Sequence, residues 1–287
     1  MKMRDLAGRT ALVTGASHGL GRYIAHALGA ERMNVVLAAR SVAELDTLAA
    51  ELRRTGVKAL PVPTDLADRS ELQRLVTAAH NEFGPVDVLV NNAGVFMPKA
   101  LHHQDASELE HHVRVNLLAP LILTSLVLPG MLERKRGHIV NLGSLAGRSP
   151  LGYVEPYAAT KAGLIAFSAS LRASYRGKGV SASAITPGFV TEAGMYRVLQ
   201  DTTHLSAPGW LGTSKPEDVA RAVVRAIQQD LPEVIVNPGP MRLMLAFRDL
   251  FPRLAEWIRV DVFERAAGVY EVTTAPSSRP PARRSNR

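Results

Sequence analysis

The stretch YAATK, from Tyr157 to Lys161, places a phenol and an ammonium group four residues apart. On a helix, residues i and i+4 lie on one face, so these two side chains would be neighbours. A free tyrosine has a pKa of ~10, and a proton donor or acceptor that works at neutral pH needs a value roughly three units lower. A fixed cation beside the phenol lowers its pKa directly. The spacing therefore predicts a proton-transfer pair, although an isolated Tyr-x-x-x-Lys is more often an ordinary helix with a surface lysine.

A second group of residues forms a candidate anion-binding turn, TGASHGLG, from Thr14 to Gly21. Gly15, Gly19 and Gly21 allow a tight turn and let backbone N–H groups approach a pyrophosphate at the N-terminus of the next helix. The strict fingerprint G-x-G-x-x-G fails, because Ile24 stands where its last glycine would be. The turn predicts a dinucleotide site because it joins the first predicted strand to the first predicted helix.

Arg40 ends the second predicted strand, where the dinucleotide fold usually carries an acid for the ribose 2′-OH of NAD. A guanidinium binds a 2′-phosphate through paired, charged hydrogen bonds, whereas a carboxylate would repel it. We therefore expect NADP(H) to be favoured over NAD(H). The alternative is a surface arginine at a strand end.

The elements that must position these residues follow a regular alternation. Seven short apolar runs occur in order: TALVTG, NVVLAA, VKALPVP, VDVLVNN, GHIVNLGS, GVSASAITPG and EVIV. Between them, helical patterns begin at about Gly19, cover 42–54, 70–83 and 113–134, carry YAATK, and cover 216–229. Apolar strands that alternate with helices predict an α/β, doubly wound, Rossmann-type sheet, mostly parallel and seven-stranded, with helices on both faces.

The domain organisation follows from the same pattern. We expect one catalytic domain over 1–238 with a lid at about 191–212. A C-terminal amphipathic helical extension should cover 239–274, and a basic tail over 275–287 should be disordered because it is rich in Pro, Ser and Arg.

Composition narrows the function classes. The 287 residues are 46% hydrophobic and 21% charged, as in ordinary soluble proteins. There is no cysteine, which excludes disulfides and thiolate metal sites, and we expect no metal. We see no signal peptide, and the apolar run 117–132 is too short and too rich in proline for a bilayer span. We expect a cytoplasmic protein, with membrane association left open.

The net charge is +8, but half of it lies in the four arginines of the tail. No nucleic acid is therefore expected as a partner.

Five features in order resemble the short-chain dehydrogenase/reductase family: TGASHGLG, NNAG, Asn116, Ser144 and YAATK. The resemblance covers about 9–238 and implies the catalytic set Asn116, Ser144, Tyr157 and Lys161. Ser144 would donate to a substrate carbonyl oxygen, and Tyr157 would give that oxygen a proton in reduction or remove one in oxidation.

In the family, Lys161 lowers the pKa of the tyrosine and holds the nicotinamide ribose. Asn116 disrupts its helix locally and holds a water that links Lys161 to solvent. Taken separately, Ser144 could be a cap and Asn116 a helix-terminal residue.

The same resemblance implies the cofactor contacts. Asp65 would receive the adenine amino group, Asn92 to Gly94 would pass the adenosine ribose, and the backbone of TPGFV would meet the nicotinamide carboxamide. Asp65 could instead, or also, cap the next helix. The expected cofactor-binding residues are Gly15, Ser17, His18, Gly19, Leu20, Gly21, Arg40, Asp65, Leu66, Asn92, Ala93, Gly94, Tyr157, Lys161, Pro187, Gly188 and Val190.

Two positions depart from the family pattern. His18 stands where the family often has Arg, Lys or Ser, which gives weaker phosphate pairing when the imidazole is neutral. Thr191 comes one residue earlier than the usual family threonine, so its role as a carboxamide ligand is open.

The segments after the sixth predicted strand bear on the substrate. The stretch 191–212 is amphipathic and contains Met and aromatic residues, which suits an apolar, fairly bulky substrate but also fits mere packing of a lid. The stretch 241–263 has apolar residues at helical spacing with arginines between them, and Pro252 divides it into two helices. It could pack on a subunit or on the lid, which we favour, dock on a membrane surface, or bind an unrelated partner.

These observations predict an NADP(H)-dependent oxidoreductase that interconverts a ketone or aldehyde and an alcohol, on a lipophilic small molecule. One alternative is a 3-oxoacyl-thioester reductase, whose acidic carrier-protein substrate would suit the positive charge. An alternative from another class is a protein that senses a dinucleotide without turnover. The family usually forms dimers or tetramers, so a homo-oligomer is expected.

Overall fold

Seven strands form one sheet in a computed structural model that describes residues 3, 5–97, 99–191 and 212–258. The strands are β1 (Thr10–Thr14), β2 (Asn34–Ala39), β3 (Ala59–Pro63), β4 (Val88–Asn91), β5 (Gly137–Leu142), β6 (Val180–Pro187) and β7 (Glu233–Val236). Every neighbouring pair is parallel, in the order β3-β2-β1-β4-β5-β6-β7. The predicted doubly wound fold class is confirmed. The predicted lid, apart from its two end residues, and the predicted tail lie outside the described residues.

The strands are apolar along their whole length because both faces of the sheet are covered. In β1, Ala11 and Val13 point into one core cluster and Leu12 points into the other, as the two-residue period of a strand requires. In β2, Val35, Val36 and Leu37 are all fully buried. An alternating polar face would leave polar side chains inside one of the two helical layers, so the continuous apolar runs are what this fold needs.

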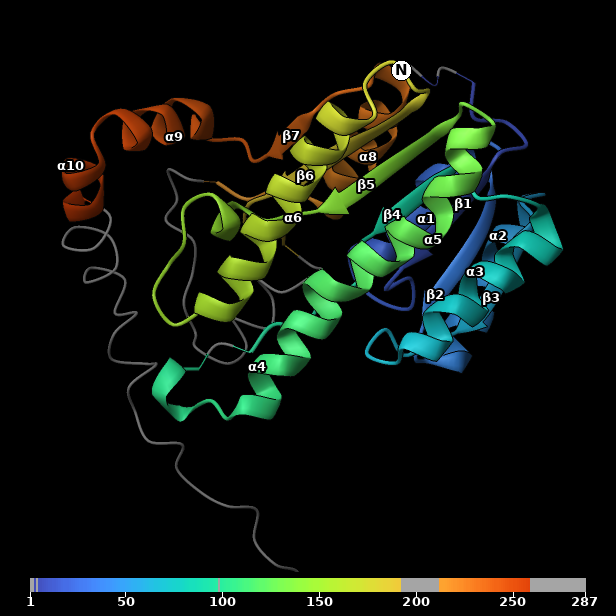
Figure 1. The fold of residues 1–287 in the computed structure, drawn as a ribbon, viewed down its shortest axis with the longest axis horizontal. Coiled ribbons are helices and arrows are strands. Elements are labelled where there is room, and N and C mark those ends of the chain that lie inside the picture. The colour runs from blue at the N-terminus through green and yellow to red at the C-terminus, as the bar shows by residue number, and fades with distance from the viewer. Residues whose placement is uncertain (1–2, 4, 98, 192–211, 259–287) are drawn as a thin grey trace, which may run out of the picture.

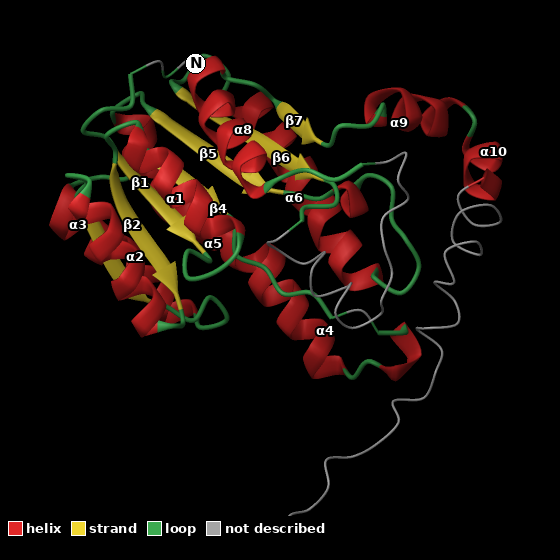
Figure 2. Cartoon of the chain, turned by 180° about the vertical axis from the view of Figure 1, so that it is seen from behind, coloured by secondary structure: helices red, strands yellow, loops and turns green. Residues whose placement is uncertain are grey.

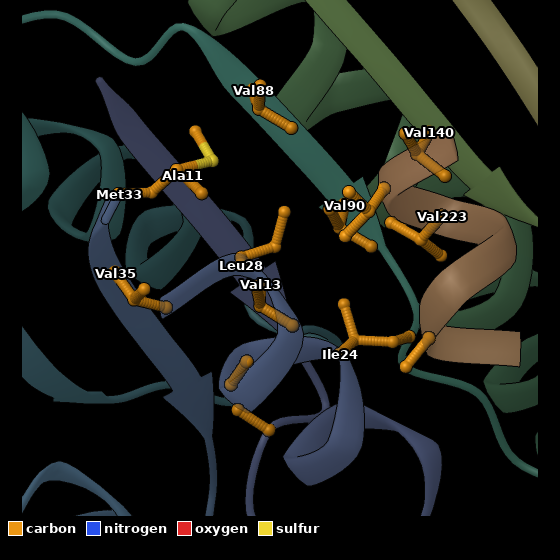
Figure 3. Packing of buried hydrophobic residues seen from close by; sticks show 14 of the residues in the cluster. Ala11, Val13, Ile24, Leu28, Met33, Val35, Val88, Val90, Val140 and Val223 are labelled. Atoms are coloured by element: carbon orange, nitrogen blue, oxygen red, sulfur yellow. The ribbon is translucent and has the colours of Figure 1, made fainter. Parts of the chain in front are cut away.

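Three helices cover each face of the sheet, as Figures 1 and 2 show. One layer contains α1 (Leu20–Ala30), α2 (Val42–Arg54) and α8 (Pro216–Gln229), and the other contains α3 (Arg69–Phe83), α5 (Ala119–Glu133) and α6 (Glu155–Ser174). Figure 3 shows the first core from close by: Ile24 and Leu28 of α1 and Val223 of α8 lie over Val13 and Val90 of the sheet.

The strand order reverses between β1 and β4. Chain connections from β1 lead outward to β2 and β3 on one side, and β4 to β7 lead outward on the other. In open α/β sheets, ligands bind beyond the carboxyl ends of the strands at such a reversal. The glycine turn after β1 and the NNAG segment after β4 both lie at this point.

The long helical stretch predicted over 113–134 starts earlier and is not uniform. It consists of α4 (Ala106–Val113), a π-helical turn at Arg114–Leu118, and α5. A capping box starts α4, because the Asp105 carboxylate accepts from the Glu108 N–H and the Glu108 carboxylate accepts from the Asp105 N–H. Within the described residues, 106–133 is the one helical stretch long and apolar enough to cross a membrane. Its side chains at Leu123 and Met131 instead pack into the core against the sheet.

The C-terminal segment forms two short helices, α9 (Met241–Leu250) and α10 (Pro252–Trp257). Pro252 occupies the first turn of α10, as its fixed φ and missing N–H favour. The predicted division at Pro252 is therefore confirmed for the described part of this segment.

Candidate active site

Tyr157 and Lys161 lie on one face of α6, close to the carboxyl end of β5. The Lys161 Nζ is 5.7 Å from the centroid of the Tyr157 ring. Lys161 is almost completely buried, and its Nζ donates a 2.7 Å hydrogen bond to the carbonyl oxygen of Leu142, the last residue of β5. The predicted juxtaposition of phenol and ammonium is present, and the lysine is fixed by a strand end.

The effect of this arrangement on the tyrosine differs from the expectation. Burial raises the pKa of Tyr157 to about 12, and a hydrogen bond with Ser144 only partly opposes that rise. Burial lowers the pKa of Lys161 to about 8. The predicted lowering of the phenol pKa by the lysine is therefore wrong for the protein alone, because loss of solvation outweighs the cation, which is bonded to Leu142 rather than to the phenol.

Ser144 follows β5 and faces the same phenol. Its Oγ accepts a 3.1 Å hydrogen bond from the Ala146 N–H, which starts the short 3₁₀ turn at Leu145–Gly147. The cap and the contact with Tyr157 coexist, so the hydroxyl is oriented by the backbone beside the phenol. The turn packs tightly on α6, since a Cβ on Gly147 would lie 2.7 Å from the backbone of Lys161 and Ala162.

Asn116 lies inside the π-helical turn and is fully buried. Its Oδ1 accepts from the Val95 N–H at 2.7 Å, and its Nδ2 donates to the Val95 carbonyl oxygen at 2.9 Å. The Nδ2 also lies 3.4 Å from the Thr160 Oγ1, on the helix that carries the tyrosine. The local disruption of the helix is confirmed, and the side chain joins the segment after β4 to α6. Its link to a water stays a prediction.

Phe96 was not among the predicted site residues. Its ring meets the Tyr157 ring edge-on, with centroids 5.0 Å apart and planes at 75°. Such T-shaped contacts stabilise the relative position of two rings. An aromatic residue two positions after NNAG is the sequence signal that could have indicated it.

The glycine turn forms a close backbone cradle. A Cβ on Gly21 would lie 2.0 Å from the Gly15 carbonyl oxygen, and one on Gly15 would lie 2.8 Å from the Ala93 Cα. Gly15 and Gly19 both have positive φ, near +66° and +56°. Only glycine suits these positions, and a turn of this kind at the start of a helix is the usual place for a bound phosphate group.

The segment after β4 supports this cradle. Asn92 donates from its Nδ2 to the carbonyl oxygens of Thr14 and Gly15, at 2.9 and 3.2 Å. The backbone N–H groups of Asn92 and Ala93 donate to the Thr14 Oγ1. Thr14, which sequence reasoning did not select, therefore ties the two turns together, and Gly94 follows directly.

Arg40 and His18 are the basic groups near the turn. Arg40 is exposed and, within the described part of the chain, has no hydrogen-bond or ion-pair partner. His18 bonds to the Ser17 Oγ at 2.9 Å, and its Nε2 lies 3.8 Å from a Glu44 carboxylate oxygen. Leu20 begins α1 beside them. A free guanidinium at the end of β2 fits a 2′-phosphate.

Asp65 does not cap α3. Its Oδ1 accepts from the Ala67 N–H, and the cap is Asp68, whose Oδ1 accepts from the Ser70 N–H. The capping alternative for Asp65 is therefore wrong, because the N-cap position lies three residues later, at Asp68. The pattern Asp68-x-x-Glu71 is a sequence signal for this start. Leu66 is buried next to Asp65, and the adenine contact of Asp65 stays a prediction.

The segment after β6 closes the other side of the site. Pro187 ends β6, and a Cβ on Gly188 would meet the Asn237 Oδ1 at 2.1 Å. Val190 is buried and bridges to Ser214 in a parallel arrangement. The Thr191 Oγ1 lies 3.3 Å from the Ser214 carbonyl oxygen, so this hydroxyl faces the protein backbone.

An ion pair, also absent from the predicted set, joins the loops on both sides of the site. The Arg148 guanidinium, four residues after Ser144, binds the Glu233 carboxylate through two nitrogens, one at 3.0 Å. The Thr186 Oγ1 donates to the same carboxylate at 2.9 Å. Glu233 thus ties the Ser144 loop to the end of β6. Among the described residues, no group of three or more His, Cys, Asp or Glu side chains could hold a metal.

This chain is similar to known proteins. A family model described as short chain dehydrogenase matches residues 9–203. The ketoacyl reductase HetN of Nostoc sp. is 40% identical over 272 residues, which cover 92% of this chain and 93% of the relative. The glycine betaine reductase ATRR of Emericella nidulans is 35% identical over 81% of this chain, which spans 19% of that longer protein.

Two solved structures are also similar. One is a metagenomic short-chain oxidoreductase in complex with NADP, with a TM-score of 0.69 and 33% identity over 81% of this chain and 98% of that one. The other is a variant of the actinorhodin polyketide ketoreductase with NADPH, with a TM-score of 0.74 and 31% identity over 82% of this chain and 97% of that one.

Proposed function

Because this chain belongs to the short-chain dehydrogenase/reductase family, we propose that it reduces the keto group of a 3-oxoacyl thioester with NADPH. It is an oxidoreductase, and its substrate is a small molecule or a small group carried on a larger one. The single observation that carries the chemistry is the position of the Tyr157 phenol beside Ser144 and the buried Lys161.

The phenol is suited to giving a proton. A pKa near 12 keeps Tyr157 protonated throughout the neutral range. Reduction needs a proton donor for the carbonyl oxygen, whereas oxidation needs a phenolate, which burial disfavours. The Ser144 hydroxyl stabilises negative charge that develops on the same oxygen, and the Lys161 cation stabilises the phenolate that remains. Lys161 is cationic below a pH of about 8.

The residues present fit NADP(H). The glycine cradle of Gly15, Gly19 and Gly21 would hold the pyrophosphate at the start of α1, and the unpartnered Arg40 would hold the 2′-phosphate. When bound, the reduced nicotinamide supplies the hydride for the carbonyl carbon. The protein's part is to orient the carbonyl, keep it beside Tyr157 and give its oxygen a proton.

The substrate class rests on two kinds of support. HetN is named a ketoacyl reductase and the actinorhodin enzyme a polyketide ketoreductase, and both names describe a keto group on an acyl chain. In this chain, the Phe96 ring beside Tyr157 provides an apolar surface at the reacting group, and the net charge of +8 suits an acidic carrier.

A substrate panel tests the proposal. Reduction of a 3-oxoacyl thioester, a simple aliphatic ketone and an aromatic aldehyde would be followed by nicotinamide absorbance, with NADPH and with NADH. We expect kcat/KM to be at least about tenfold higher for the thioester, since acyl-chain binding energy is used in the transition state. Equal or higher kcat/KM for the simple carbonyls would contradict the substrate class while leaving the carbonyl reductase activity in place.

A further inference from the structure

Helices α9 and α10 expose an unusual amount of apolar surface. Among the described residues, ten large hydrophobic side chains are exposed, and six of them lie in these two helices and the residue that joins them: Leu243, Phe247, Leu250, Phe251, Leu254 and Trp257. Leu243 and Leu250 are 74% and 73% exposed, and Trp257 is 56% exposed. The Phe247 and Phe251 rings touch, with centroids 5.3 Å apart, so the apolar side chains continue from one helix to the next. We call this pair of helices the C-terminal arm.

The arm stands apart from the body. Figures 1 and 2 both show α9 and α10 projecting beyond the end of β7, and the two helices pack chiefly on each other within the described chain. Met241, at the base of the arm, is the buried side chain of α9. The favoured packing of this segment on a second subunit or on the lid stays a prediction, because 192–211 lies outside the described residues.

Basic side chains accompany this face. Arg242, Arg248 and Arg253 alternate with the apolar residues, and Arg242 and Arg253 have no partner in the described chain. Arg248 contacts the neighbouring Asp249. A helix with Trp, Phe and Leu beside arginines has the composition of an element that lies in a membrane interface.

We propose that the C-terminal arm docks the enzyme on an anionic lipid surface. The apolar side chains would enter the headgroup boundary while the arginines bind lipid phosphates, and the net charge of +8 would favour the approach. Three arginines outnumber the two acids Asp249 and Glu256 within 241–258, so an anionic surface is more complementary in charge than a second copy of the arm.

The location of the arm determines which part of the enzyme would lie near the lipid surface. The arm begins four residues after Asn237, which lies against Gly188 at the carboxyl edge of the sheet. The catalytic residues lie at this same edge, so docking would bring the active site close to the lipid surface.

The arm also extends past the family core. The match with HetN covers 92% of this chain. The part of the chain outside the match is shorter than the segment that follows Trp257. The match therefore includes the arm. The family model stops at residue 203. The proposal does not rest on the identity of the substrate.

Vesicle flotation with the full chain tests the proposal. Vesicles of phosphatidylcholine with phosphatidylglycerol would be compared with vesicles of phosphatidylcholine alone. We expect the protein to float with the anionic vesicles, and raised salt to weaken this. The double variant Leu250→Glu, Trp257→Glu should partition at least about tenfold less. The control Val42→Glu changes a residue of α2 that is 53% exposed, and it should float like the wild type.

Thermal unfolding and reduction of a water-soluble carbonyl would show that each variant is folded. Equal flotation of the wild type and the double variant, or no flotation of either, would overturn the proposal. A wild type that stays in solution as a larger oligomer than the double variant would also overturn it, because the arm would then join copies of this chain. Binding of the protein to an acidic carrier protein, without flotation on vesicles, would also overturn the proposal.

Discussion

At the scale of single residues, the chemistry depends on how Lys161 is held. Its Nζ donates to the Leu142 carbonyl oxygen and lies beneath the Tyr157 ring, so the charge is fixed and nearly free of solvent. A buried cation of this kind loses its proton more easily than a free lysine, and its pKa falls to about 8. The catalytic centre is therefore cationic at neutral pH but not in strong base.

This gives a prediction for the pH profile. Lys161 is charged below about pH 8, and the cation stabilises the tyrosinate formed on proton transfer. We expect kcat/KM for reduction to be nearly constant from about pH 6 and to fall above about 8. Lys161→Arg should move the fall to higher pH, because a guanidinium stays charged. A profile that is flat to about pH 10 in the wild type would contradict the assigned role of this cation.

We predict that Arg40 selects between the two dinucleotides. Its guanidinium is exposed and has no partner among the described residues, so it is available for a 2′-phosphate. We expect Arg40→Asp to raise the KM for NADPH by at least about tenfold, the loss of one charged hydrogen-bonded pair, with little change for NADH.

Arg54→Asp, at the far end of α2, is the matched control and should change neither KM. If Arg40→Asp weakens NADPH and NADH equally, Arg40 does not select the phosphate.

The sequence was informative about which residues meet, but less so about their environment. The spacing of Tyr157 and Lys161 predicted their shared face, because helical periodicity is local. The rise of the tyrosine pKa could not be predicted, because the burial of a side chain depends on segments of the chain that are far apart in sequence. The edge contact of Phe96 and the bond from Lys161 to Leu142 were missed for the same reason.

At the scale of elements, two loops and two strands must keep the site together. Glu233 of β7 binds Arg148 in the Ser144 loop and Thr186 at the end of β6. The pKa of Arg148 is raised by its hydrogen bond with Glu233. The carboxylate therefore fixes the position of a catalytic loop without touching the reacting groups.

Loss of this link should affect both stability and turnover. Glu233→Gln should lower the free energy of unfolding by about 1 kcal/mol or less, because Arg148 is partly exposed and the pair is screened. We expect kcat to fall severalfold as the Ser144 loop loosens.

Denaturant unfolding and steady-state kinetics would measure the two effects. Arg221→Gln breaks the exposed pair with Asp218 and serves as the control, with kcat unchanged. An unaltered kcat in Glu233→Gln would show that the link is structural only.

Element boundaries were predictable where local patterns are strong. β2, α2, α8 and β7 match the predicted ranges, since apolar periodicity and the proline at the start of α8 are local signals. α4 was missed because its polar sequence carries little apolar periodicity, and its capping box was overlooked. Asp65 was considered a cap although Asp68 is the residue adjacent to the helix.

At the scale of the whole molecule, the seven parallel strands place the glycine turn, the NNAG segment and Ser144 at the carboxyl edge of the sheet. The alternation of strands and helices predicted this architecture, since parallel strands require crossovers. The order of the strands was not predicted, because the pattern of apolar residues does not say which strands are neighbours. The projection of the C-terminal arm was not predictable, because amphipathic spacing alone does not say which surface a helix meets.

The buried side chain of His138 makes the stability of the folded protein depend on pH. It is fully buried in β5, its Nε2 bonds to the Ser183 Oγ at 2.8 Å, and burial lowers its pKa to about 4. The unfolded chain takes up this proton near pH 6.5, whereas the folded chain does so only near 4. Stability should therefore fall as the pH drops between these values, by about 3 kcal/mol in total.

Urea unfolding as a function of pH would measure this loss. His138→Gln keeps a polar partner for Ser183 and should flatten the curve between these two pH values. His80→Gln, at an exposed position on α3, should leave the curve unchanged. An equally steep decline in His138→Gln would assign the acid sensitivity to other groups.

The central claim is that Tyr157 gives its proton to a carbonyl oxygen beside bound NADPH. Single-turnover reduction of a carbonyl substrate by the Tyr157→Phe variant, with NADPH binding measured separately by fluorescence, tests it most directly. Phenylalanine keeps the ring contact with Phe96 but has no proton to give. We predict that NADPH still binds while the reduction rate falls by roughly 10²–10⁴-fold. A reduction rate within a few-fold of the wild type would contradict the account.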